Sequence, residues 1–367
     1  MKSKLIFIFV LFAIALLLFG CTQQAESSSI KIGAVLPMSG SAASYGETWA
    51  NALSIALDDF KRDTNSNAVF LIEDSQLKPE MVVSATQKLI EVDQVRGIVT
   101  GSDTLVLLPI TGPKKVLVFT AASNPDITLK HNFVFRINPS DLEQGKKMAE
   151  LISKYGFSSV EVIGFEGEYG RGLAGAFSEN FEDGGGKRVF SQFFSDMESD
   201  FRSVLTKVKG NNADALFIIA LDSQYPQILK QAKELDINMK IFASETIHSD
   251  SVLRDSNSLA DGVTFFYFPP NGNSKFKDFE SKYLLKFGAE PGPFADSIYD
   301  AGLLALYSAY NSGNNSDKAF SYLHSLSNWS GASGNITFDA KGDPIGKTFE
   351  LYTIKNGEFV LLGDSND

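Results

Sequence analysis

Residues 30–36 read IKIGAVL, a short run of apolar and β-branched residues that ends at Pro37. Similar runs return at 68–74 (AVFLIED), 97–100 (GIVT) and 116–120 (VLVFT), and stretches with helical spacing of apolar residues separate them. Short strands that are almost wholly apolar are typical of a parallel sheet covered by helices on both faces. The alternation therefore predicts an α/β layer with right-handed crossover connections.

The rest of the chain repeats this alternation. A strand at 133–137 leads into Asn138, and the later apolar runs predict strands at 159–164, 188–194, 215–220, 240–244 and 262–270. Helices at about 275–287, 294–312 and 317–326 precede a β-type tail in which Asn356-Gly357 is a hairpin signal. The sequence thus predicts two α/β lobes, with Pro269-Pro270 as a crossing point between them.

Composition excludes several classes of function. The 367 residues include 44 acidic and 33 basic side chains, for a net charge of −11. An acidic surface without a basic run repels phosphate backbones, so we expect no nucleic-acid partner. One cysteine and three scattered histidines predict neither an intrachain disulfide nor a histidine-rich metal site, and we expect no metal and no cofactor.

The N-terminus resembles an export signal. Residues 5–19 are apolar and follow Lys2 and Lys4, and Leu18-Phe19-Gly20-Cys21 resembles a prokaryotic lipobox. This resemblance implies a lipoprotein signal peptide at 1–20, and a lipidated Cys21 with a flexible tether at 21–29. An ordinary signal peptide and an uncleaved anchor are the alternatives.

One glycine pattern suggests a different chemistry. Gly170, Gly172 and Gly175 form G-x-G-x-x-G, which on a strand–helix turn binds dinucleotides. The preceding strand is expected to end at Gly164, six residues before the first motif glycine, whereas a dinucleotide turn starts directly after its strand. We therefore expect these glycines to let a helix pack closely on the sheet, and keep an exported NAD-binding enzyme as a remote alternative. No hydrolase motif suggests catalytic residues.

Polar segments follow the predicted strands where a ligand of an open α/β sheet binds. In the first half, the segments at 37–46, 101–104 and 121–125 are rich in hydroxyls and precede helices, a chemistry suited to a carboxylate. In the second half, the segments at 166–170 and 244–246 supply acids and a tyrosine, and Asp222 follows another strand. Hydroxyls on one lobe and acids on the other predict a cleft for a zwitterion.

Four ordered motifs resemble one family. Pro37-Met38-Ser39-Gly40 with Tyr45-Gly46, the segment 121–125, the segment 136–145 and the segment 169–173 are similar to type I periplasmic binding proteins. The most similar branch is the leucine/isoleucine/valine-binding proteins, which are the substrate-binding subunits of branched-chain amino-acid ABC transporters. The resemblance runs from about Ile30 to the C-terminus.

This resemblance implies an architecture and partners. Two Rossmann-like lobes are joined by three hinge crossings, here near 139–142, 268–271 and 344–347, and close on a ligand in the interlobe cleft. Residues 30–140 plus 270–345 would form lobe 1, and residues 141–269 plus 346–367 would form lobe 2. The implied protein is a monomeric, non-enzymatic solute-binding protein on the outer face of the cytoplasmic membrane or in the periplasm. Its implied partners are an amino acid and the permease and ATPase subunits of an ABC transporter.

The resemblance also assigns roles within the cleft. Thr104 and Ser123 resemble the hydroxyl residues that hold the ligand carboxylate, and Ala121 resembles a carbonyl that helps to bind the ammonium. Glu245 resembles the ammonium-binding acid. The full set of candidate ligand-binding residues is Tyr45, Ser102, Thr104, Ala121, Ala122, Ser123, Tyr169, Asp222 and Glu245.

Two departures leave the solute open. Leu221-Asp222 stands where some relatives place an aromatic residue, and the loop at 102–104 reads Ser-Asp-Thr where relatives have a more uniform serine run. An extra acid at Asp103 or Asp222 would change the charge of the pocket. Branched-chain specificity is therefore open. Separately, a sensor of the same fold that binds an amide, urea or amino acid is the main alternative to a transport protein.

Overall fold

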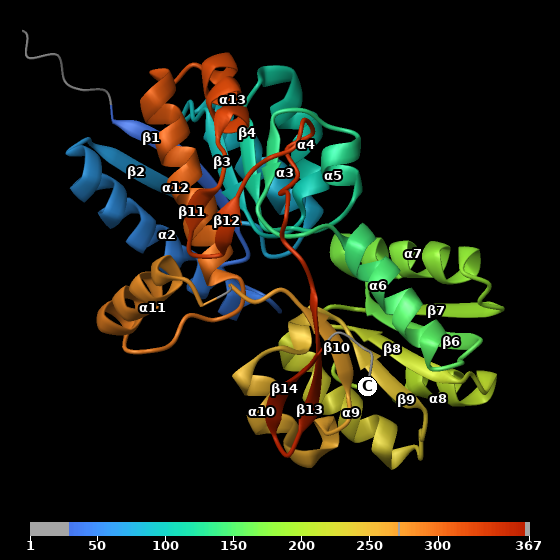
Figure 1. Cartoon of the computed structure of the whole chain (residues 1–367). Coiled ribbons are helices and arrows are strands. Elements are labelled where there is room, and N and C mark those ends of the chain that lie inside the picture. The colour runs from blue at the N-terminus through green and yellow to red at the C-terminus, as the bar shows by residue number, and fades with distance from the viewer. Residues whose placement is uncertain (1–28, 271, 364–367) are drawn as a thin grey trace, which may run out of the picture.

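The computed structural model describes residues 29–270 and 272–363, and it places them in two α/β lobes (Figure 1). The predicted signal peptide, Cys21 and all but the last residue of the tether lie outside these ranges. None of the helices in the described ranges is long and apolar enough to cross a membrane.

The first lobe is built on a five-stranded parallel sheet. Its order is β2 (Ala68–Asp74), β1 (Ile30–Leu36), β3 (Gly97–Thr100), β4 (Leu117–Thr120), β5 (Val134–Arg136). The connecting helices are α2 (Ala43–Thr64), α3 (Pro79–Glu91), α4 (Thr104–Thr111) and α5 (Asp126–Leu129). Strands β1, β3 and β4 are almost entirely buried, as expected for a sheet covered on both faces. Helix α4 follows the segment 101–104, where the sequence predicts a helix, and it contains Pro109.

The second lobe repeats the order of the first. Its sheet runs β7 (Arg188–Phe194), β6 (Ser159–Phe165), β8 (Ala215–Ile219), β9 (Lys240–Ala243), β10 (Thr264–Tyr267), β13 (Glu350–Lys355), β14 (Glu358–Leu362). The helices of this lobe are α6 (Asp141–Lys154), α7 (Glu168–Asp183), α8 (Arg202–Asn211), α9 (Tyr225–Glu234) and α10 (Asp250–Ser256). The strands from β7 to β10 are parallel, so each lobe has the 2-1-3-4-5 arrangement of a doubly wound fold.

The C-terminal tail adds an antiparallel hairpin to this second sheet. Lys355 pairs with Glu358 across a two-residue turn, and Asn356 and Gly357 both have positive φ, at 52° and 74°. Those angles are the requirement of the turn that an Asn-Gly pair favours, so the predicted hairpin is confirmed.

The remaining helices return to the first lobe. They are α11 (Ser274–Phe287), α12 (Ala295–Ser312) and α13 (Ser316–Ser325), followed by the small hairpin of β11 (Trp329–Gly331) and β12 (Gly334–Ile336). Helix α12 is buried on most of its surface and packs against α2 and the face of the first sheet. The first lobe therefore depends on two distant parts of the sequence.

The chain passes between the lobes three times in the described ranges (Figure 1). The links join β5 to α6, β10 to α11, and β12 to β13. The expected crossings near 139–142, 268–271 and 344–347 fall within these links or at their ends. Strand β10 ends at Tyr267, earlier than the sequence predicts, because Pro269 and Pro270 belong to the second crossing. We propose lobe boundaries at these links.

A buried arginine ties the first and third crossings together. The Arg136 side chain is fully buried, and its Nη2 lies 2.6 Å from Asp343 Oδ1. The same guanidinium donates to the backbone carbonyls of Ser123 and Asn124 and to the Thr128 hydroxyl. Arg136 thereby fixes the loop after β4, which faces the second lobe.

We predict that Asp343→Ala lowers the free energy of unfolding by about 3 kcal/mol, because it leaves the buried Arg136 charge without its carboxylate. Urea denaturation measures this change. The matched control is Asp317→Ala, which removes an exposed ion pair with Lys115 and should cost less than about 1 kcal/mol. Equal effects of the two substitutions would contradict the assigned role of Arg136.

Candidate functional site

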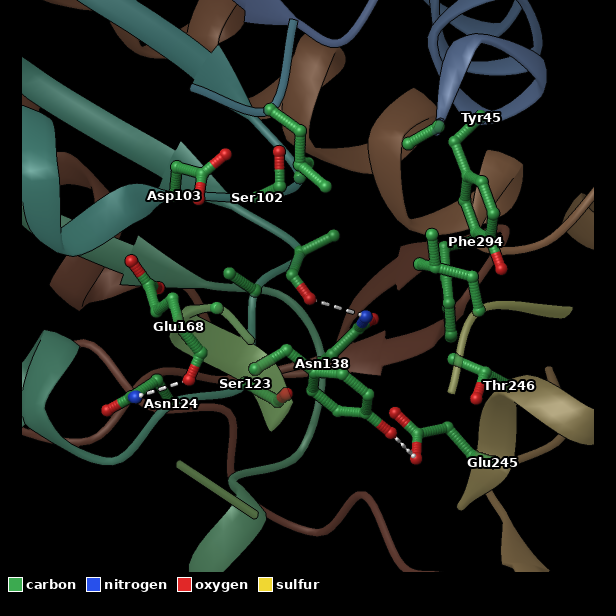
Figure 2. Close-up of a pocket in the computed structure, with 18 of the residues that line it drawn as sticks. Tyr45, Ser102, Asp103, Ser123, Asn124, Asn138, Glu168, Glu245, Thr246 and Phe294 are labelled. Atoms are coloured by element: carbon green, nitrogen blue, oxygen red, sulfur yellow. Dashed lines mark hydrogen bonds between the residues drawn. The ribbon is translucent and has the colours of Figure 1, made fainter. Parts of the chain in front are cut away.

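The carboxyl ends of the parallel strands of the two sheets face one another across a cavity (Figure 2). Segments after β1, β3 and β4 line it from the first lobe, and segments after β6, β8 and β9 line it from the second. Its volume of about 140 Å³ far exceeds the roughly 15 Å³ that holds one water molecule. The cavity is therefore large enough for a small organic molecule, and it lies where the fold predicts a ligand.

Tight packing sets the first-lobe wall. Tyr45 and Trp49 extend from α2 with their rings edge to face, 5.6 Å apart, and the Trp49 indole nitrogen donates to Pro293. Gly101 follows β3 directly, and a Cβ there would come within 2.4 Å of the Trp49 ring. A glycine at this position therefore lets the loop of Ser102 lie against α2.

The second-lobe wall is organised around Glu245, in the short 3₁₀ turn after β9. Glu245 Oε2 accepts hydrogen bonds from Tyr169 Oη and Gln144 Nε2, each at 2.6 Å. Burial raises the pKa of Glu245 above its ordinary value. Burial of Tyr169, with the nearby Glu245 charge, raises the pKa of its phenol well above 10, so the phenol stays protonated and donates a hydrogen bond to the carboxylate.

A second carboxyl group lies close behind Glu245. Asp141, at the start of α6, is fully buried, and burial together with the charge of Glu245 raises its pKa to about 8. Neither of its carboxyl oxygens has a hydrogen-bond partner among the described residues, although Ser123 and Arg136 lie near enough to oppose this rise. Two buried carboxyl groups thus lie close together on this side of the cavity.

The two lobes touch directly, so the cleft is closed. Leu105 N of α4 donates to Glu168 Oε2 of the other lobe at 2.8 Å. Asn124 Nδ2 donates to the Glu168 carbonyl at 3.0 Å, and Ser41 Oγ donates to Asp196 Oδ2 at 2.6 Å. Each of these bonds joins a first-lobe donor to a second-lobe acceptor.

Two glycines of the G-x-G-x-x-G pattern serve this packing. A Cβ on Gly170 would come within 2.0 Å of the Phe165 carbonyl oxygen, and a Cβ on Gly172 would come within 2.5 Å of Asn124 Nδ2. Gly170 thus lets α7 approach its own strand, and Gly172 lets α7 approach the opposite lobe. The first turn of α7 carries the carboxylate of Glu168, which disfavours a pyrophosphate at that position.

Most of the predicted site residues come together here. Those lining the cavity are Tyr45, Ser102, Ala121, Ala122, Ser123, Tyr169 and Glu245. The Ala121 carbonyl, expected to help to bind an ammonium, already accepts a hydrogen bond from Asn138 Nδ2 at 2.7 Å.

Thr104 and Asp222 do not line the cavity. Thr104 is fully buried inside the first lobe, where its hydroxyl lies 2.7 Å from that of Thr120. The Asp222 carboxylate accepts hydrogen bonds from Ser249 and Ser251 of its own lobe. Asp222 nevertheless lies near the cavity, because its charge adds to burial in raising the pKa of Tyr45.

The sequence assigns no role to several residues that line the cavity. Asn138 and Gln144 lie within the motif at 136–145, but only the fold shows that their side chains point into the cleft. Glu168 precedes the predicted Tyr169 by one residue. Aromatic side chains from distant segments complete the wall, namely Phe268, Phe294 and Phe349.

A family model described as "Periplasmic binding protein" matches residues 29–358. The chain belongs to the periplasmic binding protein family. This family consists of solute-binding proteins rather than enzymes, and the family expected from the sequence is therefore confirmed. In the described residues, no group of three or more histidine, cysteine, aspartate or glutamate side chains could hold a metal ion.

Known proteins are similar to this chain over nearly its whole length. The Leu/Ile/Val-binding protein of Escherichia coli K12 is 24% identical over 355 residues, which cover 92% of this chain and 95% of that protein. The crystal structure of a leucine-binding protein from Thermotoga maritima has a TM-score of 0.80 and 26% identity, covering 91% of this chain and 98% of that one. A solute-binding protein from R. palustris, solved with benzoate, has a TM-score of 0.79 and 18% identity, covering 92% and 96%.

The raised pKa of Glu168 predicts that closure of the cleft depends on pH. Burial raises its pKa from an ordinary 4.5 to about 8, with Asp103 and Asp141 adding to the shift and the amides of Leu105 and Thr104 opposing it. A raised carboxyl pKa means that the closed form holds the proton more tightly than an open form. Protonated Glu168 therefore stabilises the closed form fully below about pH 4.5, and this stabilisation is lost as the pH rises towards 8.

We expect the radius of gyration of the ligand-free protein, measured by small-angle X-ray scattering, to increase between about pH 5 and pH 8. Glu168→Gln should flatten this increase, because a neutral amide needs no proton. Glu166→Gln is the control, since Glu166 is exposed and paired with Arg171. A radius that falls as the pH rises would contradict this account.

Proposed function

We propose that this protein captures an amino acid by cleft closure and delivers it to an ABC transporter. The observation that carries the proposal is the placement of Glu245 and Tyr169 on one lobe opposite the hydroxyl-bearing segments of Ser102 and Ser123 on the other. An amino acid presents an ammonium and a carboxylate close together, which suits an acid on one wall and neutral donors on the other.

The ammonium would bind at Glu245. Gln144 and Tyr169 both donate to Glu245 Oε2, so they hold the carboxylate in one orientation. A buried carboxylate with a raised pKa is stabilised by a cation, which returns the pKa towards its ordinary value. Binding of an ammonium therefore offsets the cost of burying Glu245.

The carboxylate would bind on the first lobe. Ser102 and Ser123 lie two and three residues after the ends of β3 and β4, so short segments hold their hydroxyls close to the strand ends. These groups are neutral donors, which bind an anion without adding a competing positive charge. A ligand held at both ends contacts both lobes only when the cleft is shut, and this difference in contacts is what favours the closed form.

A lipid anchor would keep the protein close to its transporter. We propose that Cys21 carries a lipid anchor after removal of residues 1–20, so that the binding lobes are tethered on the outer face of the cytoplasmic membrane or in the periplasm. The permease and ATPase subunits of an ABC transporter are the proposed partners, and a monomer is the proposed binding unit. Titration of the 20 common amino acids by calorimetry tests the ligand class.

We predict that Glu245→Ala weakens amino-acid binding by at least about 100-fold, because the ligand ammonium would be buried without a counter-charge. Isothermal titration calorimetry measures the loss. Glu150→Ala on the exposed side of α6 is the matched control and should leave affinity unchanged. Unchanged affinity in Glu245→Ala would refute the ammonium assignment.

A further inference from the structure

The charges that line the cleft are unbalanced. Five acids line it, namely Asp103, Glu166, Glu168, Asp196 and Glu245, while no lysine, arginine or histidine of the described ranges does. Glu166 is paired with Arg171 at the rim. Across the part of the chain that the structure describes, none of the ion pairs includes any of the other four acids. An α-ammonium at Glu245 would leave three of them without a counter-charge.

Two of these three acids lie at the start of α4. Asp103 occupies the N-cap position, but its left-handed backbone, with φ 48° and ψ 34°, leaves its side chain without a capping hydrogen bond. Glu168 of the opposite lobe bonds to the amide of Leu105 instead. The Asp103 carboxylate is therefore available to a ligand, although aspartate at this position usually caps its own helix.

Buried acceptor atoms line the cavity without donors. Asp103 Oδ2 and Glu168 Oε1 are both buried and have no hydrogen-bond partner within residues 29–270 and 272–363. The same is true of Asn138 Oδ1 and Gln144 Oε1, whose side chains are only 3% and 1% exposed. The amide nitrogens of both residues already donate, to Ala121 and Glu245, so their oxygens are fixed as acceptors.

Such a cavity needs a ligand that is rich in N–H groups. A buried acceptor without a donor is unfavourable, so four of them favour a ligand that can satisfy several at once. In Figure 2, Asp103 and Glu168 lie on one side of the cavity and Glu245 lies on the other. One cationic group cannot serve both sides, but a ligand with two separated cationic groups can.

The aromatic wall is compatible with such a ligand. Tyr45, Trp49 and Phe294 line the cavity, and aromatic faces attract ammonium and guanidinium groups. The alkyl part of a long basic side chain can lie against the same rings.

We propose that the cleft selects an amino acid whose side chain carries a positive charge, with that charge held by Asp103 and Glu168 while the α-ammonium binds Glu245. This inference rests on the proposed function and names the class of amino acid that the site takes.

The positive charge also couples binding to closure. Asp103 belongs to the first lobe, whereas Glu168 and Asp196 belong to the second, so closing the cleft brings like charges together. Their mutual influence is visible in the raised pKa values: burial and then the charge of Asp196 bring Asp103 to about 6. A ligand cation between the lobes removes this repulsion, whereas a neutral side chain leaves it in place.

The test compares ligands by isothermal titration calorimetry at pH 7.5 on the full chain without its lipid. We expect L-arginine or L-lysine to bind at least 10-fold more tightly than L-leucine and L-isoleucine. Equal or tighter binding of leucine or isoleucine would overturn this inference and leave the proposed function intact. Tighter binding of acetamide or urea than of any amino acid, or no binding of any amino acid, would overturn both.

Asp103→Asn tests the assigned charge. Asparagine tolerates left-handed backbone, so the variant should fold, and a thermal melt checks this. We expect affinity for the basic amino acid to fall at least 10-fold while affinity for leucine is unchanged or rises. Asp58→Asn, which removes an exposed charge on α2, should change neither. Equal losses of affinity for both ligands in Asp103→Asn would show that Asp103 supports the fold and does not select the charge.

Discussion

The hydrogen bond from Leu105 N to Glu168 Oε2 is the contact on which the closed structure depends. It places a carboxylate of one lobe on the first turn of a helix in the other, where the helix dipole favours negative charge. It also buries the Glu168 carboxyl group beside Asp103, and burial together with the charge of Asp103 raises the pKa of Glu168 to about 8. Donors of the first lobe therefore hold the interlobe cleft shut, and the acids that they bring together would be stabilised by a bound cation.

The strand order that the two sheets share explains how one architecture can bind different solutes. The backbone segments after β1, β3, β4, β6, β8 and β9 converge whatever side chains they carry, because the two sheets share one strand order. Solute choice then rests on a few side chains on those segments. Here Glu245, held by Tyr169 and Gln144, provides for an ammonium. Asp103 and Glu168 distinguish this cleft from one suited to a wholly apolar side chain.

Local patterns in the sequence predict the fold well. The strands at 30–36, 68–74 and 188–194 have the predicted bounds, because short apolar runs have few alternatives in a covered sheet. Seven of the nine candidate residues line the cavity, since loops after parallel strands must meet at one edge. Thr104 resembles a ligand-binding hydroxyl, but α4 begins there and turns it inward to Thr120. The roles of Asn138 and Glu168 depend on contacts between distant segments, which no local pattern contains.

The central claim is that a small ligand stabilises the closed form through contacts from both lobes. The most direct test is the distance between spin labels on Lys61→Cys in α2 and Lys233→Cys in α9, in a Cys21→Ser background, by double electron–electron resonance. At pH 7.5, we predict a broad distribution without ligand and a single shorter distance with whichever of L-arginine, L-lysine or L-leucine binds most tightly. An identical distribution with and without that ligand would contradict the account.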